Sequence, residues 1–297
     1  MVNSIRLAQS ATAKQPHIAP RPFLKWAGGK HQLIGQYLPY FPTDYCHYYE
    51  PFVGGGAIFF HLQPERAVLT DINHELINVY RCVREDVENL IDRLEEHRED
   101  HCAEHYYQVR SLGVSQSGSP PTSAADIDRN LDRAARFIYL NKTCFNGLYR
   151  ENSKGGFNVP IGSYKNPVIC DPDILRADAQ ALQSAQIEVR SFDRILEQAK
   201  NAEDFVYFDP PYVPLNATSK FTSYSRYSFS EADQIRLRDV VVELRDRGVK
   251  IMLSNSDCPF VRELYKDFNI HTIYATRNIN CNAEKRGKIT EVLVTSY

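Results

Sequence analysis

The sequence lacks the long apolar runs and the leader segment that direct a chain into or across a membrane. None of its hydrophobic stretches approaches the roughly 18 residues of a membrane span. Residues 1–20 contain no apolar core of the kind found in secretory signals. We therefore expect residues 1–20 to be a disordered extension, and the protein to be cytoplasmic with no membrane partner.

Paired cysteines and a large excess of charge are also missing. The seven cysteines form no CxxC pair, and an odd number in a chain of 297 residues is typical of reduced thiols in a cytosolic protein. The formal net charge of −2 argues against a protein that coats nucleic acid without specificity. Basic residues do predominate within 129–165, and on its own such a stretch indicates a solvated basic helix face.

What the sequence does contain is an alternation of short hydrophobic strands with helices. Strands are predicted at 48–50, 67–71, 187–189, 205–208, 250–253, 270–275 and 289–295. Helices are predicted at 57–62, at 73–100 with one or two breaks, at 125–140, and from Ser230 to about Gly248; loops are predicted at 113–123 and 141–171. Repeated β-α-β units predict an α/β fold with a doubly wound sheet.

The stretch between the second and third predicted strands is too long for a single crossover connection. We therefore expect residues 21–79 and 186–297 to form the sheet domain. Residues 80–185 are expected to form a smaller, mainly helical inserted domain that carries an irregular basic loop.

A glycine-rich turn, Glu-Pro-Phe-Val-Gly-Gly-Gly at 50–56, follows the first predicted strand. Glycines at such a point let a ligand approach the backbone closely, although a simple tight turn would use them too. Asp71 ends the next strand, where a carboxylate can accept both hydroxyls of a ribose. The pair indicates a nucleoside-bearing cofactor, and NAD is disfavoured because Phe59 stands where a dinucleotide site needs a small residue.

The tetrapeptide Asp209-Pro210-Pro211-Tyr212 follows the hydrophobic strand predicted at 205–208. Ligands of open α/β sheets bind at the carboxyl ends of strands. Two prolines fix the backbone and remove two donors, which leaves the Asp209 carboxylate and the Pro210 carbonyl as acceptors beside the Tyr212 ring. This arrangement suits an NH2 group on a flat ring; a strand-ending turn capped by the aspartate is the purely structural alternative.

Taken in chain order, these motifs resemble the Dam family of DNA adenine-N6 methyltransferases. The matching segments are 23–30, 50–56, 70–73, 146–150, 157–160 and 209–212. Their order is that of the alpha class (D12 type) of amino-methyltransferases. The resemblance implies a Rossmann-like methyltransferase sheet with a smaller DNA-recognition domain. It further implies S-adenosylmethionine as cofactor and double-stranded DNA as partner, and we expect a monomer in solution.

The resemblance also implies the residues of the cofactor and catalytic sites. The cofactor-binding residues would be Trp26, Lys30, Phe52, Gly54, Asp71, Ser191, Phe192 and Asp209. An aromatic face such as that of Trp26 attracts a sulfonium cation, although a buried core tryptophan is the alternative. The catalytic residues would be Asp209 and Pro210, which accept the two N6 hydrogens of a flipped adenine, and Tyr212, which stacks on it. No metal is implied.

A loop between residues 141 and 165 matches the family's DNA-recognition region. The DNA-binding residues implied are Lys25, Phe145, Asn146, Leu148, Arg150 and Pro160. An arginine such as Arg150 can bind guanine O6 and N7 with two hydrogen bonds. Family members with these residues methylate GATC, so this site is expected. The sequence departs from the family at Ser163, where relatives carry an arginine, and this loss bears on DNA affinity more than on base specificity.

A histidine cluster and three other functions remain as alternatives. His97, His101 and His105 have the spacing of helical zinc ligands, but their acidic neighbours favour a solvated polar helix face. The other functions are an RNA adenine or protein glutamine methyltransferase, a catalytically inactive DNA-binding module and an NAD-dependent oxidoreductase. The recognition loop argues against the first of these functions, the intact Asp209–Tyr212 motif against the second, and the glycine spacing against the third.

Overall fold

A computed structural model of the chain describes residues 18–112, 123–152, 156–215, 229–276 and 288–297. Most of the expected N-terminal extension and nearly all of the loop predicted at 113–123 therefore lie outside the described residues. Among the helices of the described ranges, none combines the length and apolar character needed to span a lipid bilayer. The cysteines within those ranges are all free thiols.

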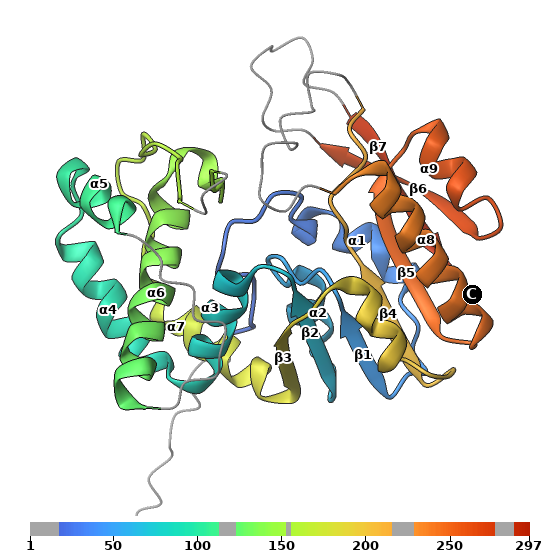
Figure 1. Ribbon diagram of the computed structural model, residues 1–297, viewed down its shortest axis with the longest axis horizontal. Coiled ribbons are helices and arrows are strands. Elements are labelled where there is room, and N and C mark those ends of the chain that lie inside the picture. The colour runs from blue at the N-terminus through green and yellow to red at the C-terminus, as the bar shows by residue number, and fades with distance from the viewer. Residues whose placement is uncertain (1–17, 113–122, 153–155, 216–228, 277–287) are drawn as a thin grey trace, which may run out of the picture.

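A seven-stranded sheet with strand order β3-β2-β1-β4-β5-β7-β6 forms the centre of the fold (Figure 1). The strands are β1 (His47–Glu50), β2 (Ala67–Asp71), β3 (Ala185–Val189), β4 (Asp204–Phe208), β5 (Lys250–Ser256), β6 (Asn269–Thr276) and β7 (Lys288–Thr295). The first five run parallel, whereas β7 is antiparallel to both β5 and β6. The predicted α/β doubly wound sheet is confirmed. The strand order reverses between β1 and β4, and open α/β sheets bind ligands at such a point.

The strands are joined by helices of very different lengths. They are α1 (Ile34–Tyr37), α2 (Ala57–Leu62), α3 (His74–Glu85), α4 (Val87–Glu99), α5 (Ala103–Ser111), α6 (Ala124–Thr143), α7 (Pro172–Ala181), α8 (Glu231–Asp246) and α9 (Pro259–Leu264). Short 3-10 helices are η1 (Lys30–Gln32), η2 (Leu38–Tyr40), η3 (Phe145–Gly147), η4 (Leu182–Ser184) and η5 (Phe192–Glu197). The sequence pattern predicts all the strands and the longer helices, but not α1, α5, α7 or α9.

Both faces of the sheet are buried, which explains why β4 is hydrophobic at nearly every position. Phe205 and Tyr207 of β4 belong to one core cluster, whereas Val206 and Phe208 point into the other. Helix α3 packs on the first face beside β2 and β3, and α8 packs on the second beside β5. The strand is thus held on both sides up to the residue that precedes Asp209.

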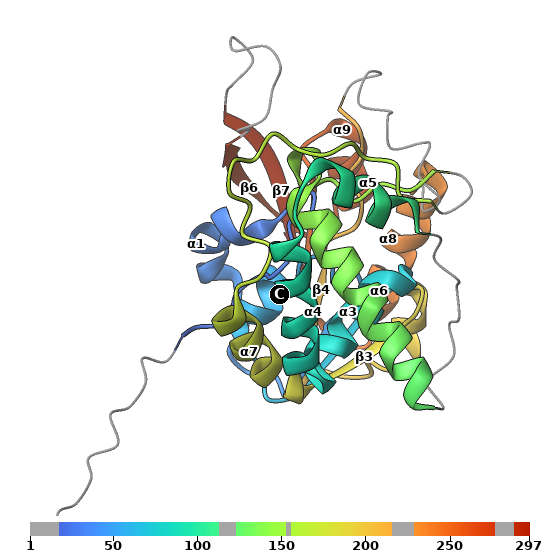
Figure 2. The same cartoon turned by 90° about the vertical axis from the view of Figure 1, so that its left-hand side faces the viewer.

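Helices α4 to α7 gather beyond α3 at one end of the sheet (Figures 1 and 2). One hydrophobic cluster runs without interruption from sheet residues such as Leu69 through Leu76 of α3 to Ile138 of α6. Helix α3 itself crosses the boundary expected between residues 79 and 80. The division into two domains remains a prediction, and the two parts share a core.

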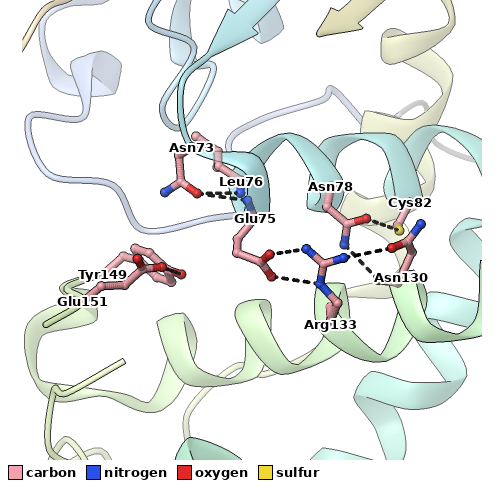
Figure 3. A network of polar contacts seen from close by, with 9 residues as sticks. All are labelled: Asn73, Glu75, Leu76, Asn78, Cys82, Asn130, Arg133, Tyr149 and Glu151. Carbon is pink, nitrogen blue, oxygen red and sulfur yellow. Dashed lines mark hydrogen bonds and ion pairs between the residues drawn. The ribbon is translucent and has the colours of Figure 1, made fainter. Parts of the chain in front are cut away.

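Polar contacts reinforce the junction between α3 and α6 (Figure 3). The Asn73 side chain caps the start of α3 by accepting from the backbone N–H of Glu75 at 3.0 Å. The Glu75 carboxylate forms an ion pair with Arg133 of α6, and Arg133 also donates to Asn130 Oδ1 at 3.1 Å. Asn78 donates to the Asn130 carbonyl at 2.9 Å. Helix α6 is thereby fixed to the helix that follows Asp71.

The basic stretch within 129–165 is not the solvated helix face that the sequence suggests. Arg136 is buried and the Arg133 side chain is only 10% exposed, and Arg136 donates to the carbonyls of Val109 and Arg110 at the end of α5. Burial lowers the pKa of Lys142 to about 8. Arg133 thus joins α6 to α3, and Arg136 joins α6 to α5, because their guanidinium groups donate to internal acceptors.

The histidine cluster also differs from the expected solvated helix face. The helix breaks after α4, so His97 lies on α4 and His105 lies on α5, with their ring nitrogens 2.9 Å apart. His97 stacks on Tyr139, and His101 lies 2.9 Å from its hydroxyl. Burial, with the neighbouring His105, lowers the pKa of His97 to about 4. Across the described part of the chain, no three His, Cys, Asp or Glu side chains are grouped to hold a metal ion.

Candidate active site

The glycine turn and Asp71 meet at the carboxyl ends of β1 and β2. Gly54 has φ +48°, and a Cβ at this position would come within 2.7 Å of the Trp26 ring, so a side chain is excluded. Tyr80 of α3 donates to the Gly54 carbonyl at 3.0 Å. Burial raises the pKa of Asp71 to about 6, although the backbone N–H groups of Asn73, Gly54 and Ile72 oppose this by stabilising the carboxylate.

Trp26 is half-buried between this turn and the helical part of the molecule. Its ring stacks with Tyr149 at a centroid distance of 6.1 Å and with Phe137 of α6 at 6.4 Å. Phe137 and Tyr149 stack on each other at 4.2 Å. The Trp26 ring is therefore partly exposed, and its contacts join the glycine turn to the loop that follows α6.

Asp209, the first residue after β4, lies against a buried lysine. Lys30 is 3% exposed, and its Nζ lies 2.9 Å from Asp209 Oδ1. The same Nζ donates to the Gly28 carbonyl and lies 4.7 Å from the centroid of the Tyr212 ring. The Ser254 hydroxyl donates to Asp209 Oδ1 at 2.8 Å. The structure thus brings together Lys30, Asp209 and Tyr212, as the sequence predicts.

The backbone of the tetrapeptide is held from behind by polar residues at the end of β5 and in α8. Gln234 of α8 donates to the Pro211 carbonyl at 2.8 Å. Asn255 accepts from the backbone N–H of Val213 at 3.2 Å, and its amide nitrogen donates to Gln234 at 3.0 Å. Ser256 donates to the Val213 carbonyl at 2.6 Å. These bonds fix the turn so that its acceptors keep one orientation.

Two carboxylates complete the surroundings of the tetrapeptide. The Tyr212 hydroxyl donates to Glu291 of β7 at 2.8 Å, which orients the aromatic ring. Glu50, at the end of β1, accepts from the Tyr48 hydroxyl at 2.7 Å. Burial raises the pKa of Glu50 to about 8. At neutral pH the Glu50 carboxyl is therefore largely uncharged.

The glycine turn also contacts the segment after β3, because Phe52 of the turn packs against Phe192, which follows Ser191. The rings of Phe52 and Phe192 stack at 5.4 Å, and Phe229 packs edge-on against Phe52 at 5.7 Å. Phe192 is buried, and Ser191 precedes it at the start of η5. The half-buried Phe52 ring, with Phe192 packed behind it, leaves an aromatic surface that a purine could contact.

The loop after α6 separates its side chains into two sets. The exposed set contains every loop residue expected to contact DNA: Phe145, Asn146, Leu148, Arg150 and Pro160. Tyr149 and Glu151, which alternate with Leu148 and Arg150, turn inward and are joined by a hydrogen bond of 2.5 Å. Arg150 donates to Asn158 Oδ1 at 2.8 Å, so its guanidinium is supported from across the loop.

A single buried amide fixes this loop against the segment that contains Lys25. Asn141 Oδ1 accepts from the Lys25 backbone N–H at 2.8 Å, and Asn141 Nδ2 donates to the Lys25 carbonyl at 2.7 Å and to the Gly147 carbonyl at 3.2 Å. Lys25 Nζ donates to the Lys142 carbonyl at 3.2 Å and lies 4.0 Å from the ring of Tyr164. The expected DNA-binding residues therefore share one surface with the segment that leads to Trp26.

Sequence reasoning missed several residues that shape the site. They are Glu50, Tyr80, Phe137, Asn141, Gln234, Ser254, Asn255 and Glu291. One signal was available, because Ser254-Asn255-Ser256 is a polar run at the carboxyl end of a hydrophobic strand, where ligands of α/β sheets bind. Glu50 bonds to Tyr48 two residues away, whereas the partners of the remaining residues are distant in sequence, so only the folded chain reveals them.

Comparisons with a family model and with individual known proteins agree with one another. Residues 26–279 match the family described as D12 class N6 adenine-specific DNA methyltransferase. The chain is 47% identical over 279 residues to the Type II methyltransferase M1.LlaDCHI of Lactococcus lactis subsp. cremoris, covering 93% of this chain and 95% of that protein. It is 43% identical over 295 residues to the Type II methyltransferase M.MjaIII of Methanocaldococcus jannaschii, covering 93% and 99%. With the DNA adenine methylase of Escherichia coli (strain K12) it shares 36% identity over 275 residues, covering 92% and 94%.

Proposed function

Because this chain belongs to the D12 class of N6 adenine-specific DNA methyltransferases, we propose that it methylates N6 of an adenine flipped out of duplex DNA, with S-adenosylmethionine as donor and GATC as target. The observation that carries the proposal is the position of Asp209. Its carboxylate follows β4 at the point where the strand order reverses, beside the half-buried Tyr212 ring.

The residues expected to hold S-adenosylmethionine fit that molecule. Trp26 presents a half-buried aromatic face, and the missing side chain at Gly54 lets that ring pack directly on the glycine turn. Asp71 offers a carboxylate for a ribose, and the half-buried Phe52 ring, backed by Phe192, offers an aromatic surface for a purine. The cofactor, when bound, supplies an electrophilic methyl group carried on a sulfonium sulfur.

The chain's own residues would orient the adenine amine. Asp209 and the Pro210 carbonyl accept one N6 hydrogen each, and this draws the nitrogen lone pair out of the ring and directs it at the methyl group. Both oxygens also stabilise the positive charge that develops on nitrogen. Tyr212, oriented by Glu291, stacks on the flipped base and offsets part of the cost of unstacking, which is about a few kcal/mol.

The exposed side of the recognition loop supports a DNA substrate and the GATC target. Arg150 is exposed and supported by Asn158, as a residue that reads guanine with a fork of two donors should be. Leu148 and Pro160 expose apolar surface suited to a thymine methyl. The E. coli relative is named DNA adenine methylase, which agrees with duplex DNA as substrate.

The direct test combines methyl transfer with mapping of the product. Purified protein is incubated with methyl-labelled S-adenosylmethionine and either unmethylated duplex DNA or structured RNA, and the modified DNA is sequenced at base resolution. We expect label in DNA alone, as N6-methyladenine within GATC. Label in RNA, or methyladenine at another sequence, would contradict the substrate or the target site respectively.

A further inference from the structure

Ser254 occupies a buried position directly behind Asp209. It lies on β5, is 0% exposed, and its Oγ lies 2.8 Å from Asp209 Oδ1. On its other side, the Tyr207 hydroxyl lies 3.1 Å from the same Oγ. Tyr207 is also buried, so neither hydroxyl can exchange its partner for bulk water.

The number of hydroxyl protons fixes the direction of the two hydrogen bonds that link Tyr207, Ser254 and Asp209. A serine hydroxyl carries one proton, and an ionised carboxylate can only accept. Ser254 donates its one proton to Asp209 Oδ1 at 2.8 Å, with a longer contact of 3.5 Å to the Phe208 carbonyl, so the proton between Tyr207 and Ser254 is supplied by Tyr207. A hydroxyl that itself accepts a hydrogen bond becomes a better donor, so Tyr207 strengthens the bond to the carboxylate.

Both donors at Asp209 converge on the same oxygen. Lys30 Nζ and Ser254 Oγ each contact Oδ1, at 2.9 Å and 2.8 Å. Within the described part of the chain, no donor contacts Oδ2. One oxygen is thus anchored on the protein while the other is left to accept from a ligand.

We propose that Ser254, supported by Tyr207, is a positioning residue for methyl transfer: it anchors Oδ1 of Asp209 so that Oδ2 is presented to the adenine amine. The inference rests on the function proposed above. The terminal torsion of an aspartate is broad and two-fold, so a carboxylate held by Lys30 alone would turn more freely. Because the reaction needs the amine lone pair aligned with the methyl group, that freedom lowers the rate of the chemical step.

The main experiment separates binding from chemistry in Ser254→Ala. We expect kcat, and the single-turnover rate, to fall about 10-fold to 100-fold, as for loss of a hydrogen bond to a charged group. KM for DNA and for S-adenosylmethionine should stay unchanged, because Ser254 is buried behind the carboxylate and contacts neither ligand. Ser296→Ala is the matched control: the Ser296 hydroxyl also bonds to β5, at Ile251, but far from Asp209, so kcat should match the parent enzyme.

A second arm tests whether Tyr207 acts through Ser254. Tyr207→Phe alone should lower kcat in the same direction but by less, because Ser254 keeps its own proton. In the Ser254→Ala background, Tyr207→Phe should have no further effect on kcat. If the effects of the two substitutions on kcat were additive, Tyr207 would not act through Ser254. Thermal unfolding of each variant identifies any general loss of stability.

Two results would overturn the role of Ser254, and both differ from a failure of the proposed function. Unchanged kcat in Ser254→Ala would show that the anchor is not needed. A fall in kcat matched by a rise in KM or by a large loss of thermal stability would assign Ser254 a purely structural role. If instead the parent enzyme methylates no DNA adenine, the proposed function fails before any variant is compared.

Discussion

At the scale of single residues, the site depends on carboxylates with different surroundings. Asp209 is ion-paired to Lys30, Asp71 is bound by backbone N–H groups, and Glu50 is buried beside the Tyr48 hydroxyl. Because their surroundings differ, the three groups respond differently to substitution, and burial raises the pKa of Asp71 and of Glu50 by different amounts.

Removing the Asp209 carboxylate should abolish methylation of duplex DNA while the fold persists. Asp209→Ala deletes the acceptor for one N6 hydrogen, so the amine lone pair is no longer directed at the methyl group. We expect activity below detection with a native circular dichroism spectrum. Asp209→Asn, which keeps a carbonyl oxygen but gives up the charge, is the matched variant and should retain weak activity. Normal turnover in Asp209→Ala would contradict the mechanism.

Acidification should weaken cofactor binding through Asp71, whose pKa is raised to about 6 by burial. An ionised carboxylate accepts both ribose hydroxyls, whereas the protonated acid keeps one oxygen occupied by its own hydrogen. The ionised form therefore binds more tightly, and affinity for S-adenosylmethionine should fall by up to about 10-fold for each pH unit below that pKa. Calorimetric titration from about pH 5 to about pH 8 measures this.

Asp71→Asn provides the control for the pH experiment because it cannot titrate. It should bind S-adenosylmethionine more weakly, with an affinity that changes less across the same pH range. An equally steep pH dependence in this variant would assign the titration to another group, such as Glu50.

At the scale of secondary structure elements, the α3–α6 junction is held by one buried ion pair. Arg133→Ala removes the partner of Glu75, whose side chain is 8% exposed. An uncompensated buried charge should cost about 3–5 kcal/mol of unfolding free energy. Denaturant unfolding measures the loss. Arg129→Ala on the same helix breaks an exposed pair with Asp126 and should cost at most about 1 kcal/mol, so equal losses would contradict the assignment.

The recognition loop yields a prediction about specificity. Arg150→Ala should relax discrimination at one base pair of the target by about 1–3 kcal/mol, because the fork of donors to guanine is lost. Methylation rates on a panel of singly substituted GATC duplexes measure this. Arg150→Lys keeps the charge but not the fork and should also relax discrimination, with less loss of overall affinity. An unchanged preference in both variants would mean that another residue reads that base pair.

Sequence patterns predict the elements that depend on local rules. The helix that begins at Ser230 is found because Ser230 and Asp233 form a capping box, and Gly248 follows it with φ +80°. The glycine turn at 50–56 and the tetrapeptide at 209–212 are also found, because each is a contiguous motif in the local sequence. Short helices such as α5 and α9 are missed, because a single amphipathic turn or two gives no clear period.

Interactions between distant segments could not be predicted in this way. β5 was predicted to end at Leu253, whereas it continues through Ser254-Asn255-Ser256. Nothing in the local sequence indicates that these polar residues extend a strand, because their partners are β7 and the turn after β4. The arginines of α6 were misassigned for the same reason, since a buried carboxylate more than fifty residues away turns Arg133 inward.

At the scale of the whole molecule, an aromatic stack connects the expected cofactor site with the expected DNA surface. Trp26, Phe137 and Tyr149 each stack on the other two, and Tyr149 directly precedes Arg150. A ligand that orders the tryptophan therefore also favours one position of the loop. Such coupling is reciprocal for the two binding free energies.

Tyr149→Ala should weaken both S-adenosylmethionine and DNA binding, each by about 2-fold to 10-fold, as expected for loss of an aromatic pair. It should also remove any increase in DNA affinity that the cofactor produces in the parent enzyme. Fluorescence anisotropy with and without cofactor measures both effects. Tyr107→Ala, an exposed aromatic on α5 outside the stack, is the control, and a change in DNA affinity alone would show that the stack does not couple the sites.

The alternation of inward and outward side chains along the recognition loop has a consequence for how such enzymes diversify. Asn141, Tyr149 and Glu151 face inward and bind the loop to the rest of the chain, whereas Leu148 and Arg150 face outward. Outward positions can therefore mutate without disturbing the scaffold. Under the function proposed above, new target sequences would arise by a few exchanges at these outward positions, and a directed library restricted to Leu148, Arg150 and Pro160 would sample those exchanges without changing the catalytic residues.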